Sequence, residues 1–418
     1  MTAPESIPAG SGARPRRPDP ATCLYAARAL RDFGDGFIAV LLAVYLTELG
    51  FSPLAIGVVA TAALLGSSLT TLAIGLFAPP GVQRALLLAA SGLMVATGLA
   101  FAVSASLPWL LFVAFVGTIN PSAGNVSIFV PMEHALLAGS AAASHRTRLF
   151  AVYGLAGSIA ASVGALAAGT PELLAGLGWA RMDALRAMFY LYAALGVAGG
   201  LCYRLVPAAA PSAPEARSFA LGPSKRIVLR LAALFSIDAF AGGFAVQSLL
   251  ALWLFQRFDL SLAAAGTFFF GAGLLAALSY PAAAWLAGRI GLINTMVYTH
   301  IPSSLCLIAA AFAPDLRLAL GFLLARAALS QMDVPTRSSY VMAVVTPAER
   351  AAAASVTSVP RGLASAASPA IAGAWMAAGN AAWPLVACGL LKIAYDLLLL
   401  WTFRHVKPPE EVRRQSSG

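Results

Sequence analysis

Long apolar segments recur about every 30 residues along this chain of 418, and twelve of them can be delimited. Each approaches or exceeds the roughly 20 residues that a helix needs to cross the hydrocarbon core of a bilayer. Backbone amides in lipid have no water to bind, so such segments form helices. The predicted spans are 27–49, 54–78, 84–104, 108–138, 147–170, 185–206, 228–256, 261–287, 292–313, 316–345, 351–378 and 382–404. We therefore expect an all-α integral membrane protein with twelve transmembrane helices.

The basic residues alternate between the two sides of these spans. With the N-terminus placed in the cytoplasm, 18 of the 27 Lys and Arg residues fall on the inner side and four on the outer side. This bias follows the positive-inside rule and predicts that both termini are cytoplasmic. The net charge of +10 then reflects topology and contact with the membrane surface, and we do not expect nucleic-acid binding.

The two halves of the chain resemble each other. Val130-Pro131-Met132-Glu133 is echoed at an offset of 204 (334 − 130) by Val334-Pro335-Thr336-Arg337, and the same offset pairs Arg146 with Arg350. Glu133 and Arg337 thus carry opposite charges at one equivalent position. Internal repeats of this kind are typical of secondary transporters.

A Pro- and Ala-rich stretch separates the repeats and predicts a flexible cytoplasmic linker. The predicted organisation is a disordered basic tail without a signal peptide (1–23), an N-terminal six-helix bundle (24–206), the linker (207–226), a C-terminal six-helix bundle (227–405) and a second cytoplasmic tail (406–418).

Twelve helices in two parallel halves resemble the major facilitator superfamily. Between helices 2 and 3, where the family has a Gly-x-Leu-Ala-Asp-Arg-x-Gly-like loop, residues 76–84 lack the acidic residue, and the counterpart 286–291 is closer to the motif. Segment 154–169 lacks the family's antiporter pattern, and Ser368–Gly373 is only reminiscent of it. The resemblance implies two pseudo-symmetric bundles that rock about a central cavity lined by helices 1, 4, 7 and 10.

Carboxylates inside these spans are costly in lipid, which makes them functional candidates. The candidates for proton coupling are Asp35, Glu133, Asp238 and Asp333. Two of them have a structural alternative. Glu133 is the first choice for the proton carrier, although a permanent ion pair with a basic residue explains it equally well. Asp333 can pair with Arg337 four residues later on the same helical face.

Other polar residues in the spans are candidates for lining the substrate cavity: Asn120, Asn125, Gln247, Arg326, Gln331 and Arg361. Arg326 and Arg361 have no acidic neighbour in sequence, so acids of the other half or a substrate anion must neutralise them. Pro121 is expected to bend the fourth helix, since it removes a backbone hydrogen bond.

Two further pairings are predicted. Lys392 and Asp396 are four residues apart and are expected to form a structural pair. Glu133 and Arg337, equivalent by pseudosymmetry, are expected to close an inner gate.

These features favour a secondary active transporter for a small organic solute, coupled to protons, with export preferred and uptake of a small organic anion as the alternative. An enzyme is disfavoured, because none of the four histidines forms a metal motif and no strand precedes the glycine-rich segment 271–276. A non-transporting scaffold or sensor would leave the buried charges unexplained. We expect a monomer in a bacterial inner membrane, with no cofactor or metal.

Overall fold

The computed structural model describes residues 19–79, 81–123, 127–139, 143–207, 221–346 and 349–406. Within these ranges the chain forms sixteen helices and no strand. Most of both predicted tails, most of the predicted linker and Asn125 lie outside the described residues.

The N-terminal half holds six of the predicted spans. Its helices are α1 (Pro20–Glu48), α2 (Pro53–Phe77), α3 (Gln83–Val103), α4 (Leu107–Val116), α5 (Phe129–Gly139), α6 (Ala143–Ala167), α7 (Thr170–Gly176) and α8 (Arg181–Leu205). Helices α4 and α5 together form the fourth span, and α7 is a short helix in the loop after the fifth.

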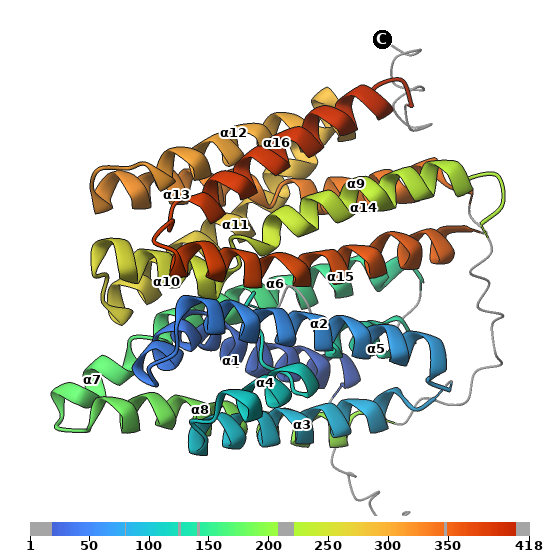
Figure 1. Cartoon of the computed structure of the whole chain (residues 1–418). Coiled ribbons are helices and arrows are strands. Elements are labelled where there is room, and N and C mark those ends of the chain that lie inside the picture. Colours follow the sequence, from blue (N-terminus) through green and yellow to red (C-terminus); the bar gives the residue numbers. More distant parts are fainter. Residues whose placement is uncertain are drawn as a thin grey trace, which may run out of the picture.

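The C-terminal half repeats this plan. Its helices are α9 (Lys225–Gly243), α10 (Gln247–Phe258), α11 (Leu262–Ile290), α12 (Leu292–Ala311), α13 (Leu316–Ser330), α14 (Asp333–Val344), α15 (Arg350–Ala377) and α16 (Trp383–Phe403). Each of the twelve predicted spans therefore contains helix, and the helices of the two halves lie against each other (Figure 1).

Helix starts follow local capping chemistry. Ser52 accepts a hydrogen bond from the Ala55 amide and precedes Pro53, the residue best suited to a first helical turn. The first helix begins at Pro20, seven residues before the predicted start at 27 (27 − 20), because Asp19 caps it in the same way. Residues 20–23, predicted as part of a disordered tail, are helical.

Three of the spans are interrupted. The fourth breaks between Val116 and Phe129, the seventh between Gly243 and Gln247, and the tenth between Ser330 and Asp333. Pro121 was expected only to bend its helix, but the helix stops.

The cause of the longest interruption is local. Pro121 cannot donate to the helix, and the Asn120 side chain instead accepts a hydrogen bond from the Ser122 amide at 2.9 Å. Ala123 then adopts a positive φ of 48°. Non-helical backbone at this depth of a membrane protein is tolerated only where protein buries it or where it lines a cavity.

Eight described stretches are long and apolar enough to cross a membrane. The remaining predicted spans are the first helix, with its four charged residues from Arg28 to Asp35, the polar α15, and the interrupted fourth and tenth spans. These four spans supply many of the charged residues discussed below, among them Asp35, Glu133, Arg337 and Arg361.

The N-terminal ends of α1 and α9 and the C-terminal ends of α8 and α16 lie at one face of the molecule, which we call the linker face (Figure 1). The opposite face, which carries α7 and the loop between α1 and α2, is the far face. Helix α2 packs along α15 and α6 along α11, which joins the two halves.

The halves are closed against each other at the far face. Glu172 of α7 accepts hydrogen bonds from the amides of Leu262 (2.6 Å) and Ala263 (3.0 Å) at the start of α11. The backbones of α2 and α15 approach so closely that a Cβ on Gly57 would lie 2.4 Å from the carbonyl oxygen of Pro369.

The apolar cores show the same asymmetry. Toward the far face one continuous core joins both halves, with Phe37 and Leu46 from α1 and Leu249 and Trp253 from α10. Toward the linker face each half has a core of its own, and neither contains residues of the other half. The described structure is therefore bound together at the far face and divided at the linker face.

Candidate functional site

A small polar pocket lies where the fourth span is interrupted. Arg31 and Asp35 of α1, Ser67 of α2, and Thr118 and Ser127 of the interruption contribute to its lining. Phe37, two residues after Asp35, belongs to the core shared by both halves. The pocket thus lies at the level where the shared core gives way to the divided linker side.

Asp35 is the unusual residue of this pocket. Its side chain is buried, with 2% of the residue exposed, and its Oδ1 accepts a hydrogen bond from the Tyr192 hydroxyl at 3.4 Å. The same hydroxyl contacts the backbone oxygen of Thr118 at 3.0 Å. No cation lies within 4.0 Å of Asp35 among the described residues.

Glu133 is held very differently. It is fully buried, its Oε2 pairs with Nη1 of Arg31 at 2.9 Å, and its Oε1 accepts a hydrogen bond from Tyr203 at 2.5 Å. Tyr153 donates a further hydrogen bond to Oε2. These contacts match the permanent ion pair that the sequence left open as the alternative to a proton carrier.

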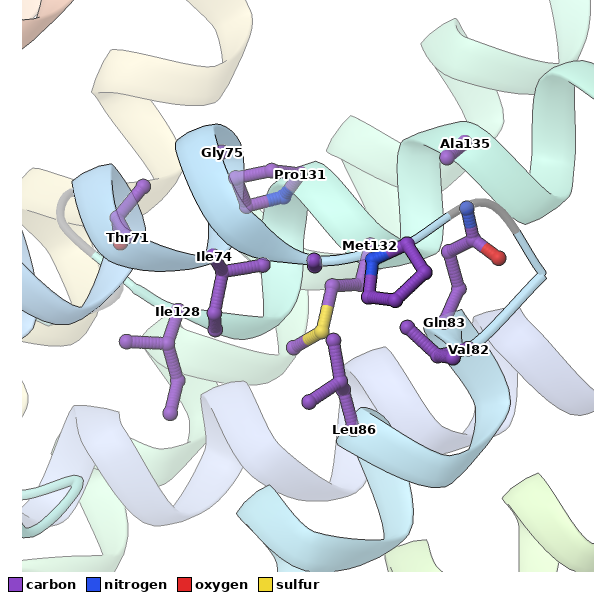
Figure 2. Close-up of a pocket in the computed structure, with 12 residues that line it drawn as sticks. Thr71, Ile74, Gly75, Val82, Gln83, Leu86, Ile128, Pro131, Met132 and Ala135 are labelled. Carbon is purple, nitrogen blue, oxygen red and sulfur yellow. The ribbon is translucent and has the colours of Figure 1, made fainter. Parts of the chain in front are cut away.

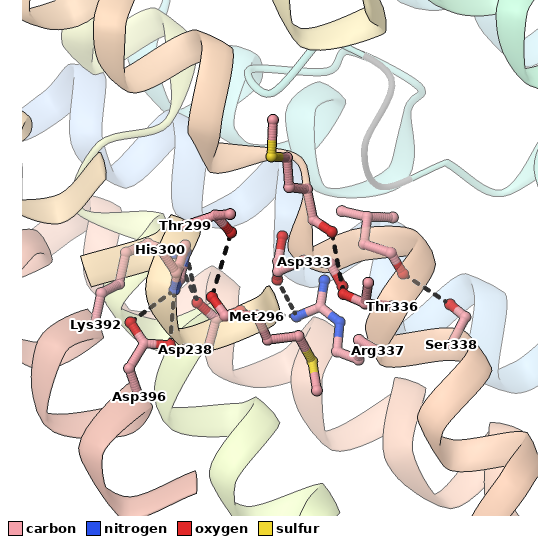
Figure 3. Close-up of polar contacts among 12 residues, drawn as sticks. Asp238, Met296, Thr299, His300, Asp333, Thr336, Arg337, Ser338, Lys392 and Asp396 are labelled. Carbon is pink, nitrogen blue, oxygen red and sulfur yellow. Dashed lines mark hydrogen bonds and ion pairs between the residues drawn. The ribbon is translucent and has the colours of Figure 1, made fainter. Parts of the chain in front are cut away.

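The C-terminal half has a corresponding cluster (Figure 3). Asp238 of α9 lies between Arg337 of α14, at 2.9 Å, and Lys392 of α16, at 2.6 Å. The predicted pair of Asp333 and Arg337 is confirmed at 3.3 Å. Two carboxylates and two cations therefore share this part of the bundle.

The two clusters have opposite polarity. In the N-terminal half the cation, Arg31, comes from the first span and the acid, Glu133, from the fourth. In the C-terminal half the acid, Asp238, comes from the first span and the cation, Arg337, from the fourth. This inversion explains the opposite charges in the sequence repeat, since each half is neutralised by its own first helix.

The structure does not bring Glu133 and Arg337 together. Each of the two predicted gate residues pairs within its own half, so the expected ion pair between them is not formed in this conformation.

The predicted pair of Lys392 and Asp396 is wrong. Lys392 contacts Asp238, and Asp396 contacts Nδ1 of His300 at 3.0 Å. Both partners lie on other helices, which the spacing of residues on α16 cannot indicate. The sequence analysis also did not identify His300 and Tyr192 as site residues. An isolated polar residue in an apolar segment gives no indication of which residue on another helix it contacts.

The remaining candidates are scattered around these clusters. Arg326 is half-buried and forms no ion pair with any described residue. Arg361 is also half-buried, and its Nε is buried without a hydrogen-bond partner. Gln247 begins α10 and Gln331 lies in the interruption of the tenth span, whereas Asn120 shapes the turn described above.

A second pocket opens between α2, α3 and α5 near the linker face (Figure 2). Ile74, Leu86, Pro131 and Met132 make its lining predominantly apolar. It borders the loop that departs from the family motif, and it contains none of the predicted site residues.

Comparison with known proteins places this architecture among transporters. The sequence profile of the Major Facilitator Superfamily matches residues 24–330. An uncharacterized membrane protein of Saccharomyces cerevisiae, YJR124C, is 24% identical over 417 residues, covering 91% of this chain and 93% of the yeast protein.

Two solved structures have the same fold. A D-xylose-proton symporter matches with a TM-score of 0.73 at 14% identity, covering 91% of this chain and 96% of its own. The nucleoside transporter NupG matches with a TM-score of 0.70 at 14% identity, covering 93% and 100%. The yeast relative gives no support to the expected bacterial origin.

Proposed function

The chain belongs to the major facilitator superfamily of membrane transporters, and we propose that it moves a small organic solute by alternating access coupled to protons, with Asp35 as the proton carrier. The observation that carries this proposal is the environment of Asp35, a buried carboxylate without a cationic partner among the described residues.

An ionised carboxylate buried without a counter-ion costs several kcal/mol, and such a group is relieved by taking up a proton. The other buried carboxylates of the described spans each contact a cation or a histidine: Asp32 with Arg28, Glu133 with Arg31, Asp238 and Asp333 with Arg337, and Asp396 with His300. Asp35 is therefore the carboxylate whose charge changes with the least disruption of existing pairs.

The proposed cycle rests on the asymmetry of the apolar cores. The shared core at the far face and the divided cores at the linker face support a state that opens toward the linker face. The bias of basic residues supports placing this face in the cytoplasm, which makes the described state inward-facing. We place the transporter in a cell membrane as a monomer.

Export remains the proposed direction, supported by the antiporter-like segment Ser368–Gly373 in α15. A second candidate function is proton-coupled uptake of a small organic anion. It is favoured by Arg326, which has no ion-pair partner among the described residues, and by the unbonded Nε of Arg361.

The test is a pH-gradient assay in sealed inverted vesicles that contain the protein. Organic anions, cations and neutral compounds are added one at a time, and dissipation of the gradient is recorded for wild type and for Asp35→Asn. The matched control is Asp183→Asn, which removes an exposed carboxylate at the far face.

The proposal expects one class of compound to dissipate the gradient in wild type and in the control, and at least a tenfold slower rate in Asp35→Asn. Equal rates in all three proteins would exclude Asp35 as the carrier. If no compound acts, the same panel is tested for uptake into right-side-out vesicles, where the second candidate predicts accumulation of an anion.

A further inference from the structure

His300 is a buried titratable residue that the proposed function does not use. It lies on α12 with 2% of its surface exposed, and its ring faces Lys392 and Asp396 of α16 and Asp238 of α9. Its Nδ1 lies 3.1 Å and 3.0 Å from the two oxygens of Asp396. Its Nε2 lies 3.3 Å from Nζ of Lys392 (Figure 3).

These contacts define the protonation of the ring. A lysine ammonium is only a donor, so the Nε2 that faces Lys392 must act as an acceptor. An ionised carboxylate is only an acceptor, so the Nδ1 that faces Asp396 must carry the proton. Both neighbours therefore require the same neutral tautomer, in which Lys392 donates to His300 and His300 donates to Asp396.

Lys392 also holds Asp238. Its Nζ lies 2.6 Å from Asp238 Oδ1, and Nε2 of His300 lies 3.9 Å from the same oxygen. A proton on Nε2 would convert the acceptor into a positively charged donor directly beside the ammonium. The two cations would repel each other, and Asp238 Oδ1 would be within about 1 Å of a direct hydrogen bond from His300.

We propose that His300 is a second proton-binding site, at which a proton on Nε2 displaces Lys392 from Asp238 and takes its place. The side chain of Lys392 is 14% exposed, compared with 3% for His300 and 4% for Asp238, so it is the member of the group with room to leave. The proton comes from solvent, and the total charge of the cluster rises by one.

Charged and titratable groups from several helices surround this site, and Arg361 of α15 also acts on Asp238. Helix α16 supplies Lys392, Tyr395 and Asp396, and α9 supplies Asp238. Behind Asp238, α14 supplies Arg337 and Asp333. Helix α13 brings the backbone of Arg326 against Ser303, one turn along α12 from His300.

The displacement has a consequence for transport. Arg337 stays on Asp238 through the other carboxylate oxygen, so the contact between α9 and α14 persists while α16 is released. A freed ammonium on α16 is a binding group for an anion. Proton binding at His300 would thus create a positive site, in addition to the proton carried by Asp35.

The test uses nuclear magnetic resonance on the intact protein in lipid nanodiscs between pH 5 and pH 9. The sequence contains four histidines and three lysines, so selective ¹⁵N labelling of each type gives few signals. His300→Gln assigns the histidine signal and Lys392→Met assigns the lysine signal. His405→Gln is the control, since it removes an exposed histidine at the linker face.

The proposal expects an Nδ1-protonated ring at high pH that gains a proton on Nε2 in one step. The Lys392 ammonium signal should shift with the same midpoint in wild type and in His405→Gln, and should stay constant in His300→Gln. If His300→Gln does not fold, Asp396→Asn provides the assignment, because it changes the partner of Nδ1.

The proposal would be overturned if the His300 ring gains no proton between pH 9 and pH 5. It would also be overturned if the Lys392 signal does not change together with the His300 signal. Neither result depends on transport, so failure here is distinguishable from failure of Asp35 as the carrier.

Discussion

At the scale of single residues, Asp35 and Glu133 meet opposite environments within one bundle. Glu133 is matched by the Arg31 guanidinium and two tyrosine hydroxyls, whereas Asp35 has one long hydrogen bond from Tyr192. Burial alone therefore does not identify a proton carrier. Under the proposed function, the number of compensating partners is what separates Glu133, which stays ionised, from Asp35, which exchanges a proton.

The pairing of Glu133 predicts a large effect on stability. Glu133→Gln removes the closer of the two carboxylates that Arg31 contacts and leaves only Asp32 at 3.4 Å. We expect a loss of up to about 3–5 kcal/mol in the free energy of unfolding. The double variant Arg31→Gln/Glu133→Gln should recover much of the lost stability, because the buried guanidinium is gone and the side-chain oxygen of the glutamine at position 133 still accepts a hydrogen bond from a tyrosine. Thermal unfolding in detergent measures the stability of both variants.

The control for this pair is Glu48→Gln. Glu48 contacts Arg181 at 2.7 Å, but the two side chains are 36% and 59% exposed. We therefore expect Glu48→Gln to lower the free energy of unfolding by less than about 1 kcal/mol. A double variant no more stable than Glu133→Gln alone would contradict the account of Glu133 as a structural ion pair.

Arg361 provides a second test at this scale. If the substrate is an anion that contacts its guanidinium, Arg361→Gln should weaken binding at least tenfold, which corresponds to about 1.4 kcal/mol. Arg317→Gln, at an exposed position, should have no effect. Equal affinities in both variants, measured with the compound that dissipates the pH gradient, would remove the anion candidate.

The sequence indicates which residues are costly but not what compensates them. Asp35, Glu133 and Arg337 stand out because charge is rare in apolar runs. Their partners do not, because Arg31 and Glu133 are 102 positions apart and Asp238 and Arg337 are 99 apart. Spacing can indicate a pair only when both residues lie one turn apart on one helix, as Asp333 and Arg337 do and as Arg28 and Asp32 do.

At the scale of helices, the interrupted spans and the close crossings determine the geometry. The interruption after Val116 leaves the Pro121 carbonyl free, and it accepts a hydrogen bond at 3.1 Å from the Ser248 amide at the start of α10. A break in one half thus contacts a break in the other.

The sequence predicted the twelve spans, but hydropathy averaged over a whole span cannot show where a turn such as Asn120–Ala123 is more stable than continued helix.

The crossing of α2 and α15 predicts a conformational effect. Gly57→Val would place a side chain against the carbonyl of Pro369, so we expect it to hold the far face open. The matched control is Gly75→Val on the same helix, where a Cβ meets nothing within 4 Å. The measurement is labelling of an engineered cysteine at position 61, on the crossing face of α2.

Labelling should rise severalfold in Gly57→Val and remain at the parent level in Gly75→Val. Unchanged labelling in both would show that this crossing does not hold the far face closed.

The start of α15 offers a pH-dependent contact outside the spans. Hydrogen bonds from the hydroxyls of Ser224 and Thr346 lower the pKa of Glu349 from 4.5 to about 2. Glu349 also accepts a hydrogen bond from the Gly222 amide, which ties the end of the linker to this loop. Because the folded pKa is depressed, the contact is complete above about pH 4.5 and is lost as the pH falls toward 2.

Glu349→Gln should loosen this contact at neutral pH. We expect faster hydrogen exchange at the amides of Gly222 and Ser224, with little change elsewhere. Wild-type exchange at these amides, corrected for the intrinsic rate, should be constant from pH 7 to pH 5. Equal protection in variant and wild type would contradict a role for Glu349 in holding the linker.

At the scale of the whole molecule, two bundles of similar design carry clusters of inverted polarity and meet over a single core at the far face. The repeat in the sequence predicted the two halves. It could not predict the conformation, because an inward-facing and an outward-facing transporter contain the same helical spans. The two conformations differ in whether the halves share an apolar core at the far face or at the linker face.

The most direct measurement of the central claim is the number of protons bound by the purified protein, which requires no substrate. Detergent-solubilised wild type, Asp35→Asn and Asp183→Asn are titrated in unbuffered solution from pH 9 to pH 5. Asp183→Asn removes an exposed carboxylate at the far face and serves as the control. The account predicts that Asp35→Asn takes up one proton fewer than the other two proteins. An equal uptake in all three would contradict it.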